Sequence, residues 1–176
     1  MDKEYVILVD ENDRETGICE KLEAHQKGLL HRAFSIFLFN KKGEYLLQQR
    51  ADEKYHTPGL WSNTCCSHPR PDEKMEDALK RKLFQELGIS AQVEKAFDFM
   101  YRAEFDNGLI ENELDHVYFG EYSEKPNPNP EEIQAWKYIS YEEIKAEMAQ
   151  DEAKFTPWFK LVLDKVHQHY KKMIKA

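Results

Sequence analysis

Apolar and polar positions alternate in short blocks along the chain, and these blocks predict a mixture of strands and helices. Residues 5–9 are a β-branched run followed by acidic turn residues, and residues 33–39 are almost continuously apolar. A run of that kind predicts a strand buried on both faces of a sheet. The turn at residues 40–43 leads into residues 44–50, so we expect a hairpin whose first strand is central.

One helix is marked clearly by its apolar spacing. Leucines and a methionine recur every four positions from Met75 to Leu87, which is the stripe of an amphipathic helix. Asp72 is the predicted N-cap, and Gly88 is placed to end the helix in the left-handed conformation. Glu86 lies where the helix dipole disfavours a carboxylate, so we expect a cation beside it.

The second half of the chain predicts three more strands and two more helices. A Pro-rich loop at residues 123–132 separates the strand pair from the last strand. Thr156 and Pro157 have the sequence of an N-cap followed by a first-turn proline. The predicted strands are residues 93–105, 109–122 and 135–139, and the predicted helices are residues 141–150 and 157–174.

Composition narrows the class of protein. A chain of 176 residues that is 41% hydrophobic fits one domain, residues 1–176. The net charge of −8 and the lack of a long basic run argue against a nucleic-acid partner. No secretory segment and no run of about 18 apolar residues is present, so we expect a cytoplasmic protein without a membrane span. Three cysteines make no disulfide framework and suit a reducing compartment.

A thiol and an imidazole stand close together in the middle of the chain. Cys66 and His68 are separated by one residue, so in an extended segment both project to the same side. A proton donor would then lie beside a metal ligand, although a thiol on its own is more often a small core side chain. His25 and His31 are six residues apart and cannot share one helical face, so a loop must join them if they act together.

Carboxylates and cations supply the remaining candidates. Glu111, Glu113 and Asp115 lie on one face of a predicted strand, where they repel one another unless a cation or protons intervene. A solvated sheet edge is the alternative interpretation. With three histidines, two of the glutamates predict a five-ligand metal site. Arg50 and Lys54 follow a strand, where they are either ordinary solvated residues or a clamp for a diphosphate.

A resemblance to a known superfamily begins at Ser67. The pattern S-x5-E-x7-R-K-L-F-Q-E-L-G-I, which ends at Ile89, resembles the Nudix box G-x5-E-x7-R-E-U-x-E-E-x-G-U. Lys82 and Gln85 stand where a Nudix hydrolase carries metal-binding glutamates. Losing these oxygen ligands weakens the binding of hard cations. The resemblance therefore implies that diphosphate recognition is kept while hydrolysis is lost.

The whole set of motifs is more specific than the box. The C-x-H pair, the E-N-E triplet at residues 111–113, the two early histidines and the altered box together resemble the type 1 isopentenyl-diphosphate Δ-isomerases, over nearly the entire chain. This resemblance implies a Nudix-type α/β/α sandwich with a mixed central sheet. It also implies interconversion of isopentenyl and dimethylallyl diphosphates, in which protonation at one carbon and deprotonation at another move the double bond.

The same resemblance assigns roles to individual residues. The four predicted catalytic residues are Cys66, Glu113, Tyr101 and Trp158. The predicted ligands of one divalent ion, Mn²⁺ or Zn²⁺, are His25, His31, His68, Glu111 and Glu113. Glu86 and the Cys66 carbonyl match the site of a Mg²⁺ that enters with the diphosphate. The cations that match diphosphate-binding positions are Lys21, Arg50, Lys54 and Lys82.

Three other functions fit parts of the pattern. A Nudix hydrolase would release phosphate from a nucleoside diphosphate derivative. A metal-dependent binding or regulatory domain would bind ion and ligand without turnover. A structural zinc domain would unfold on chelation, although three histidines and two glutamates offer more oxygen donors than closed zinc sites use. The isomerase interpretation predicts a small allylic or homoallylic diphosphate as partner, and a monomer or weak homodimer.

Overall fold

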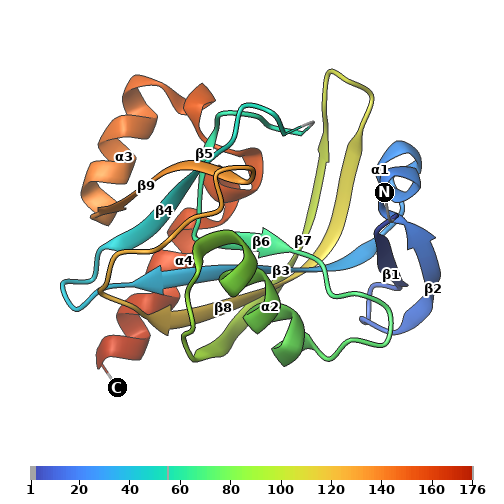
Figure 1. The fold of residues 1–176 in the computed structure, drawn as a ribbon, viewed down its shortest axis with the longest axis horizontal. Coiled ribbons are helices and arrows are strands. Elements are labelled where there is room, and N and C mark those ends of the chain that lie inside the picture. The colour runs from blue at the N-terminus through green and yellow to red at the C-terminus, as the bar shows by residue number, and fades with distance from the viewer. Residues whose placement is uncertain (1–2, 55, 176) are drawn as a thin grey trace.

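A long central strand organises the fold in the computed structural model, which describes residues 3–54 and 56–175 (Figure 1). This strand, β3 (His31–Phe39), is buried at every position except Arg32. One edge of β3 pairs in parallel with β8 (Ile110–Glu121) along its whole length. The other edge is shared in turn by β1 (Tyr5–Val9), β6 (Cys65–Ser67) and β4 (Tyr45–Arg50). The predicted central, doubly buried strand is confirmed.

The predicted hairpin between residues 33–39 and 44–50 is wrong beyond its turn. β3 and β4 pair only where Phe39 faces Tyr45. β4 instead pairs antiparallel with β9 (Ile133–Ile139) along its length, and its end pairs with the short β5 (Trp61–Ser62). The reason is that β6 already occupies the middle of that edge of β3, so β4 has to diverge from it.

The sequence predicted the strand pair at residues 93–122 but not the pairing in the N-terminal part of the sheet. β7 (Val93–Glu104) pairs antiparallel with β8, as the turn at residues 106–108 predicts. The N-terminal part contains β2 (Glu15–Glu20), paired with β1, and α1 (Lys21–Lys27), neither of which the apolar pattern predicted. β2 is largely exposed and α1 has only seven residues, so neither carries a readable stripe. α1 stands at one end of the sheet (Figure 1).

Helices cover both faces of the sheet and create two cores. Ile36 and Leu38 of β3 pack in the cluster that contains α2 (Met75–Leu87). Phe37 and Phe39 point to the opposite face, into the cluster that contains α3 (Tyr141–Gln150) and α4 (Pro157–Lys175). This alternation follows from the two-residue period of a strand. The α/β/α sandwich with a mixed sheet is confirmed. Within the described residues, no helix has the length and apolar character needed to cross a membrane.

The start of α2 differs from the prediction. Asp72 has a φ of 65° and is not the N-cap, because the helix begins at Met75 after Lys74. The Glu73 carboxylate organises this loop instead. It accepts hydrogen bonds from Nε and Nη2 of Arg81, both at 2.8 Å, and from the backbone N–H of Arg70 at 2.9 Å. The other end is as predicted, with Gly88 at a φ of 64°.

The Glu73–Arg81 pair gives a pH-dependent prediction. Hydrogen bonds from Arg81 lower the pKa of Glu73 below its ordinary value of 4.5. A lowered folded-state pKa stabilises the fold above pH 4.5, and this contribution is lost as the pH falls through the folded value. Glu73→Gln should lower the free energy of unfolding by roughly 1–2 kcal/mol at pH 7. Urea unfolding at pH 7 and under acidic conditions would measure the difference.

The matched control is Glu76→Gln, because Glu76 is exposed on the first turn of the same helix. We expect that variant to unfold like the native protein at both pH values. A loss in the Glu73 variant that is the same at both pH values would contradict the assignment of the effect to the Arg81 pair.

Candidate active site

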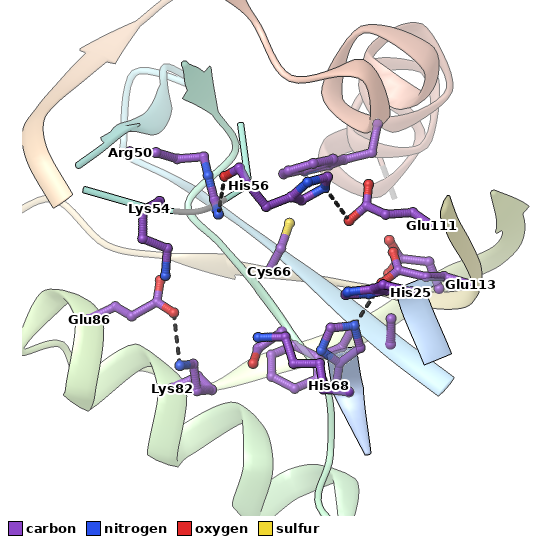
Figure 2. A pocket seen from close by; sticks show the side chains of 16 residues that line it. His25, Arg50, Lys54, His56, Cys66, His68, Lys82, Glu86, Glu111 and Glu113 are labelled. Atoms are coloured by element: carbon purple, nitrogen blue, oxygen red, sulfur yellow. Dashed lines mark hydrogen bonds and ion pairs between the residues drawn. The ribbon is translucent and has the colours of Figure 1, made fainter. Parts of the chain in front are cut away.

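One pocket gathers side chains from α1, β3, β4, β6, α2, β8 and α4 and from the loop after β4 (Figure 2). Its chemistry differs between its two ends. Arg50, Lys54, Lys82 and Glu86 lie at one end, His25, His68 and Glu113 lie at the other, and Cys66 lies between them. The residues that line it, apart from Ala33, are Lys21, His25, Phe34, Arg50, Lys54, His56, Cys66, Ser67, His68, Lys82, Glu86, Glu111, Glu113, Asp115 and Trp158.

The histidine end is a tight cluster of four predicted metal ligands. One potential ligand atom from each of His25, His31, His68 and Glu113 lies within 4.8 Å of the others. The Nε2 atom of His68 is 2.7 Å from Oε2 of Glu113 and 3.2 Å from Nε2 of His31. Nδ1 of His31 is 2.9 Å from the carbonyl of Leu29. If Nδ1 of a neutral His31 donates to this carbonyl, Nε2 of the same ring keeps a lone pair that can bind a metal ion.

The loop between α1 and β3 brings the first two histidines together. His25 lies near the C-terminal end of α1, which ends at Gly28 with a φ of 67°. His31 is the first residue of β3, and the two ring centroids are 5.3 Å apart. Glycine tolerates this left-handed conformation without steric cost. The chain therefore reverses direction between the two imidazoles, as their six-residue spacing required.

The protonation states of this cluster fit a divalent cation. Burial lowers the pKa of His25 to about 3 and that of His68 to about 4, so both imidazoles are neutral at pH 7. Burial alone would raise the pKa of Glu113, but its contacts with His31 and His68 outweigh burial and lower that pKa. Burial likewise acts to lower the pKa of His31, but the contact with Glu113 outweighs it and raises that pKa. Both ring nitrogens of His25 are buried without a hydrogen-bond partner among the described residues. Neutral imidazoles beside an ionised carboxylate are a metal-binding donor set.

The fifth predicted ligand, Glu111, lies in the same pocket but outside this four-residue cluster. Its Oε2 atom is 3.2 Å from Nε2 of His56, and its Oε1 atom is buried without a hydrogen-bond partner among the described residues. His56 is 6% exposed and packs edge-on against Phe105. His56 carries no signal in the sequence, because it lies in the loop after β4 and belongs to no motif.

The three carboxylates in the first half of β8 are all buried, which excludes a solvated sheet edge for them. Glu111, Glu113 and Asp115 are 6%, 7% and 2% exposed. Burial, together with the charge of Glu113, raises the pKa values of Glu111 and Asp115. Asp115 also accepts a 2.7 Å hydrogen bond from Ser35. Of these three carboxylates, Glu113 is therefore the one whose surroundings favour the charged form.

The cationic end confirms the compensation that was predicted for Glu86. Nζ of Lys82 lies 3.1 Å from Oε2 of Glu86, one helical turn away on α2. Arg50 donates a 3.1 Å hydrogen bond to the backbone carbonyl of His56, and Lys54 is paired with Glu132. The four predicted diphosphate-binding cations, Lys21, Arg50, Lys54 and Lys82, all line the pocket.

The neighbouring cysteines face opposite sides of the sheet. Cys66 lines the pocket, whereas Cys65 is fully buried in the α2 core, with its Sγ atom 3.7 Å from Oε1 of Glu86. Burial raises the pKa of the Cys66 thiol, so it carries its proton at pH 7. Trp158 forms one wall of the pocket. Tyr101 lies behind it, in an edge-on contact with a centroid separation of 6.5 Å.

Comparison with known proteins identifies the family. An isopentenyl-diphosphate Δ-isomerase of Pectobacterium atrosepticum is 48% identical over 165 residues, which cover 94% of this chain and 92% of that protein. An isopentenyl-diphosphate Δ-isomerase of Halorhodospira halophila is 44% identical over 163 residues, covering 91% and 93% of the two chains. The chain belongs to the isopentenyl-diphosphate Δ-isomerase family. The predicted family resemblance is therefore confirmed.

This member of the isopentenyl-diphosphate Δ-isomerase family has the Nudix fold. The NUDIX domain model matches residues 29–159. The solved structure of DR0079 from Deinococcus radiodurans aligns with a TM-score of 0.73 at 20% identity, covering 92% of this chain and 98% of the other. A MutT protein from Methanosarcina mazei Go1 aligns with a TM-score of 0.65 at 19% identity, covering 81% and 96%. These two likenesses show the fold.

The structure shows where the two altered positions of the Nudix box lie in this isomerase-family member. Lys82 points into the pocket, where a hydrolase of the Nudix type would carry an acidic ligand. Gln85, the other replaced position, is exposed and does not line the pocket. The box thus keeps Glu73, Arg81, Glu86 and Gly88, and it has lost the acidic side chains at positions 82 and 85.

Proposed function

We propose that this pocket interconverts isopentenyl and dimethylallyl diphosphate, with Cys66 and Glu113 as the two groups that transfer protons. The observation that carries the proposal is that a protonated thiol from β6 and an ionised carboxylate from β8 line the same buried pocket. A shift of a carbon–carbon double bond needs an acid and a base at two carbons of one bound substrate. The resting pair supplies one of each.

The reaction follows from these protonation states. The thiol of Cys66 gives its proton to the terminal CH₂ carbon of isopentenyl diphosphate, which leaves a tertiary cation at the neighbouring carbon. The carboxylate of Glu113 then removes a proton from the CH₂ group on the other side of that cation, and the new double bond forms there. The reverse reaction uses the same pair with the roles exchanged. Tyr101, packed behind Trp158, orients a proton near Glu113, its cross-strand neighbour.

We further propose which ions the site uses. His25, His31, His68, Glu111 and Glu113 would hold one Mn²⁺ or Zn²⁺, whereas Glu86 and the Cys66 carbonyl would hold a Mg²⁺ bound to the diphosphate. The bound ion would offset the charge of the buried carboxylates and set the acidity of Glu113. Three imidazoles in one cluster favour a transition metal or zinc over Mg²⁺ there.

The diphosphate binds at the opposite end of the pocket in this proposal. Arg50, Lys54 and Lys82 lie together on that side of Cys66 (Figure 2), and Lys21 reaches the pocket from α1. Several cations around one anionic group give charge-assisted hydrogen bonds. A head group held there places the hydrocarbon part of a short substrate beside Cys66.

Trp158 is expected to stabilise the cationic intermediate through its ring face. It is 6% exposed and lines the pocket, and a desolvated cation–π contact is worth about 2 kcal/mol. Trp158→Leu should therefore lower kcat by about 30-fold and change KM by less than about threefold. Steady-state kinetics with isopentenyl diphosphate would measure both constants.

Trp136→Leu is a suitable control, because Trp136 packs against the α2 core and does not line the pocket. Its kcat should stay close to the native value. A Trp158 variant with an unchanged kcat and a raised KM would show that the indole binds substrate without acting on the cation.

The other functions are separated by one set of assays. The protein would be incubated with isopentenyl diphosphate and, separately, with nucleoside diphosphate derivatives, and both dimethylallyl diphosphate and inorganic phosphate would be measured. We expect the isomer and no phosphate release. Phosphate release would indicate a Nudix hydrolase, and unchanged isopentenyl diphosphate would indicate a binding domain. A chelator should stop turnover while the circular dichroism spectrum stays native, whereas a structural zinc domain would unfold.

The remaining proposals concern the cellular form of the protein. We propose that residues 1–176 act as one domain in the cytoplasm, as a monomer or weak homodimer. A small diphosphate is its expected partner, and the net charge of −8 disfavours nucleic acid. Light scattering at several protein concentrations would measure the oligomeric state.

A further inference from the structure

A buried asparagine links two side chains to which the proposed reaction assigns roles, Cys66 and Trp158. Asn63 is 1% exposed and lies between β5 and β6. Its side-chain oxygen, Oδ1, accepts a hydrogen bond from the Cys66 thiol at 3.1 Å and from the indole N–H of Trp158 at 3.3 Å. The Ser62 hydroxyl donates to the same oxygen at 2.9 Å. Three donors from three residues therefore converge on one atom.

The surroundings of Asn63 fix which end of its amide faces Cys66 and Trp158. The side-chain nitrogen, Nδ2, donates to the backbone carbonyls of Ile36 at 3.0 Å and Cys65 at 3.1 Å. Carbonyl oxygens only accept hydrogen bonds, so a flipped amide would place its oxygen against two acceptors. It would also turn an NH₂ group toward the N–H of Trp158, which only donates. The amide therefore has one orientation.

The thiol is held from a second side by β3. The Ser35 hydroxyl lies 3.3 Å from the Cys66 sulfur and donates its proton to Asp115. A cysteine side chain that is free to rotate has three staggered positions. Contacts with Asn63 and Ser35 select one of them, in which the sulfur faces the pocket.

We infer that Asn63 is a positioning residue that sets the thiol of Cys66 and the indole of Trp158 at one fixed spacing, so that proton donor and cation-facing ring meet the same substrate carbon chain. This inference rests on the proposed isomerase function. Neither β6 nor α4 fixes that spacing alone, because the two side chains come from segments more than 90 residues apart in sequence. A small misplacement of a reacting group costs on the order of 100-fold in rate.

The first test replaces Asn63 by alanine. Because the diphosphate-binding cations lie elsewhere in the pocket, we expect kcat to fall by on the order of 100-fold while KM changes by less than about threefold. Asn63→Ser is the second variant. Its short hydroxyl can still donate to a backbone carbonyl, but it does not supply the oxygen shared by Cys66 and Trp158. Asn63→Ser should show the same loss of kcat. It therefore provides the measurement if the alanine variant does not fold.

Thr64→Val is the matched control. Thr64 is also 1% exposed, and its hydroxyl makes two buried hydrogen bonds, from the N–H of Leu38 at 2.9 Å and to the carbonyl of Leu46 at 2.7 Å. It contacts neither Cys66 nor Trp158 through these bonds. The control should lose stability, as the Asn63 variants do, and retain a near-native kcat. Equal losses of kcat in all variants would overturn the inference, as would near-native kcat in the Asn63 variants.

A double variant supplies a readout that a merely structural role would not change. If Asn63 acts through the indole, the kcat loss in Asn63→Ala with Trp158→Leu must be smaller than the product of the two single losses. A simple product would show that the two residues act independently and would contradict the inference. Failure of the native protein to isomerise isopentenyl diphosphate would instead reject the proposed function itself, so the two failures are distinguishable.

Discussion

Cys66→Ala is expected to fold normally and to lose isomerase activity by roughly 10³- to 10⁴-fold, since it lacks one of the two proton-transferring groups. The alanine removes the thiol proton but keeps the backbone of β6 and its pairing with β3. Diphosphate binding should survive, because the cations lie on other elements. Turnover would be followed by detecting dimethylallyl diphosphate, and folding by thermal unfolding.

Cys65→Ala is the control that the sequence itself offers. Its thiol is also buried, but it belongs to the α2 core and not to the pocket. We expect some loss of stability and nearly native turnover. The assignment of Cys66 would be wrong if its alanine variant turned over at a rate close to that of the native protein.

Glu113→Gln should have an equally large effect and a second consequence. An amide cannot accept the substrate proton, so isomerisation should fall by roughly 10³-fold or more. The carboxylate also lies 2.7 Å from His68 and 3.4 Å from His31, and without its negative charge the histidine cluster should hold a divalent ion more weakly. Kinetics and competition with a chromogenic chelator would measure the two effects.

Glu121→Gln tests whether such a loss is specific. Glu121 is the exposed last residue of the same strand, β8, and its loss of charge should alter neither turnover nor metal binding. Near-native turnover by Glu113→Gln would contradict the proposed base. Normal metal binding by an inactive Glu113 variant would remove it from the ligand set while leaving its catalytic role.

Local patterns explain which parts of the fold could be predicted. The apolar stripe from Met75 to Leu87 and the apolar run at residues 33–39 could be predicted because the spacing of apolar residues within each segment indicates which of its faces is buried. The pairing of β4 with β9 joins segments more than 80 residues apart, and nothing in residues 44–50 selects that partner. Asp72 was a reasonable N-cap by residue type. The conformation of that loop instead depends on the ion pair between Glu73 and Arg81, which are eight positions apart in the sequence.

The same distinction applies to the site. Cys66, His68, Glu111 and Glu113 could be proposed because short motifs and a family resemblance mark them. His56 and Asn63 could not, because their roles depend on partners that are distant in sequence: Glu111 for the first and Trp158 for the second. An isolated histidine or asparagine in a loop carries no signal of that kind.

The most direct measurement is an incubation of isopentenyl diphosphate with the native protein in deuterated water, with and without a chelator. We expect NMR to show dimethylallyl diphosphate that carries deuterium in a methyl group, formed only without the chelator, and no such product from Cys66→Ala. Deuterium-free product, or unchanged substrate with the metal-replete native protein, would contradict proton transfer between solvent-exchangeable groups of this pocket and the substrate.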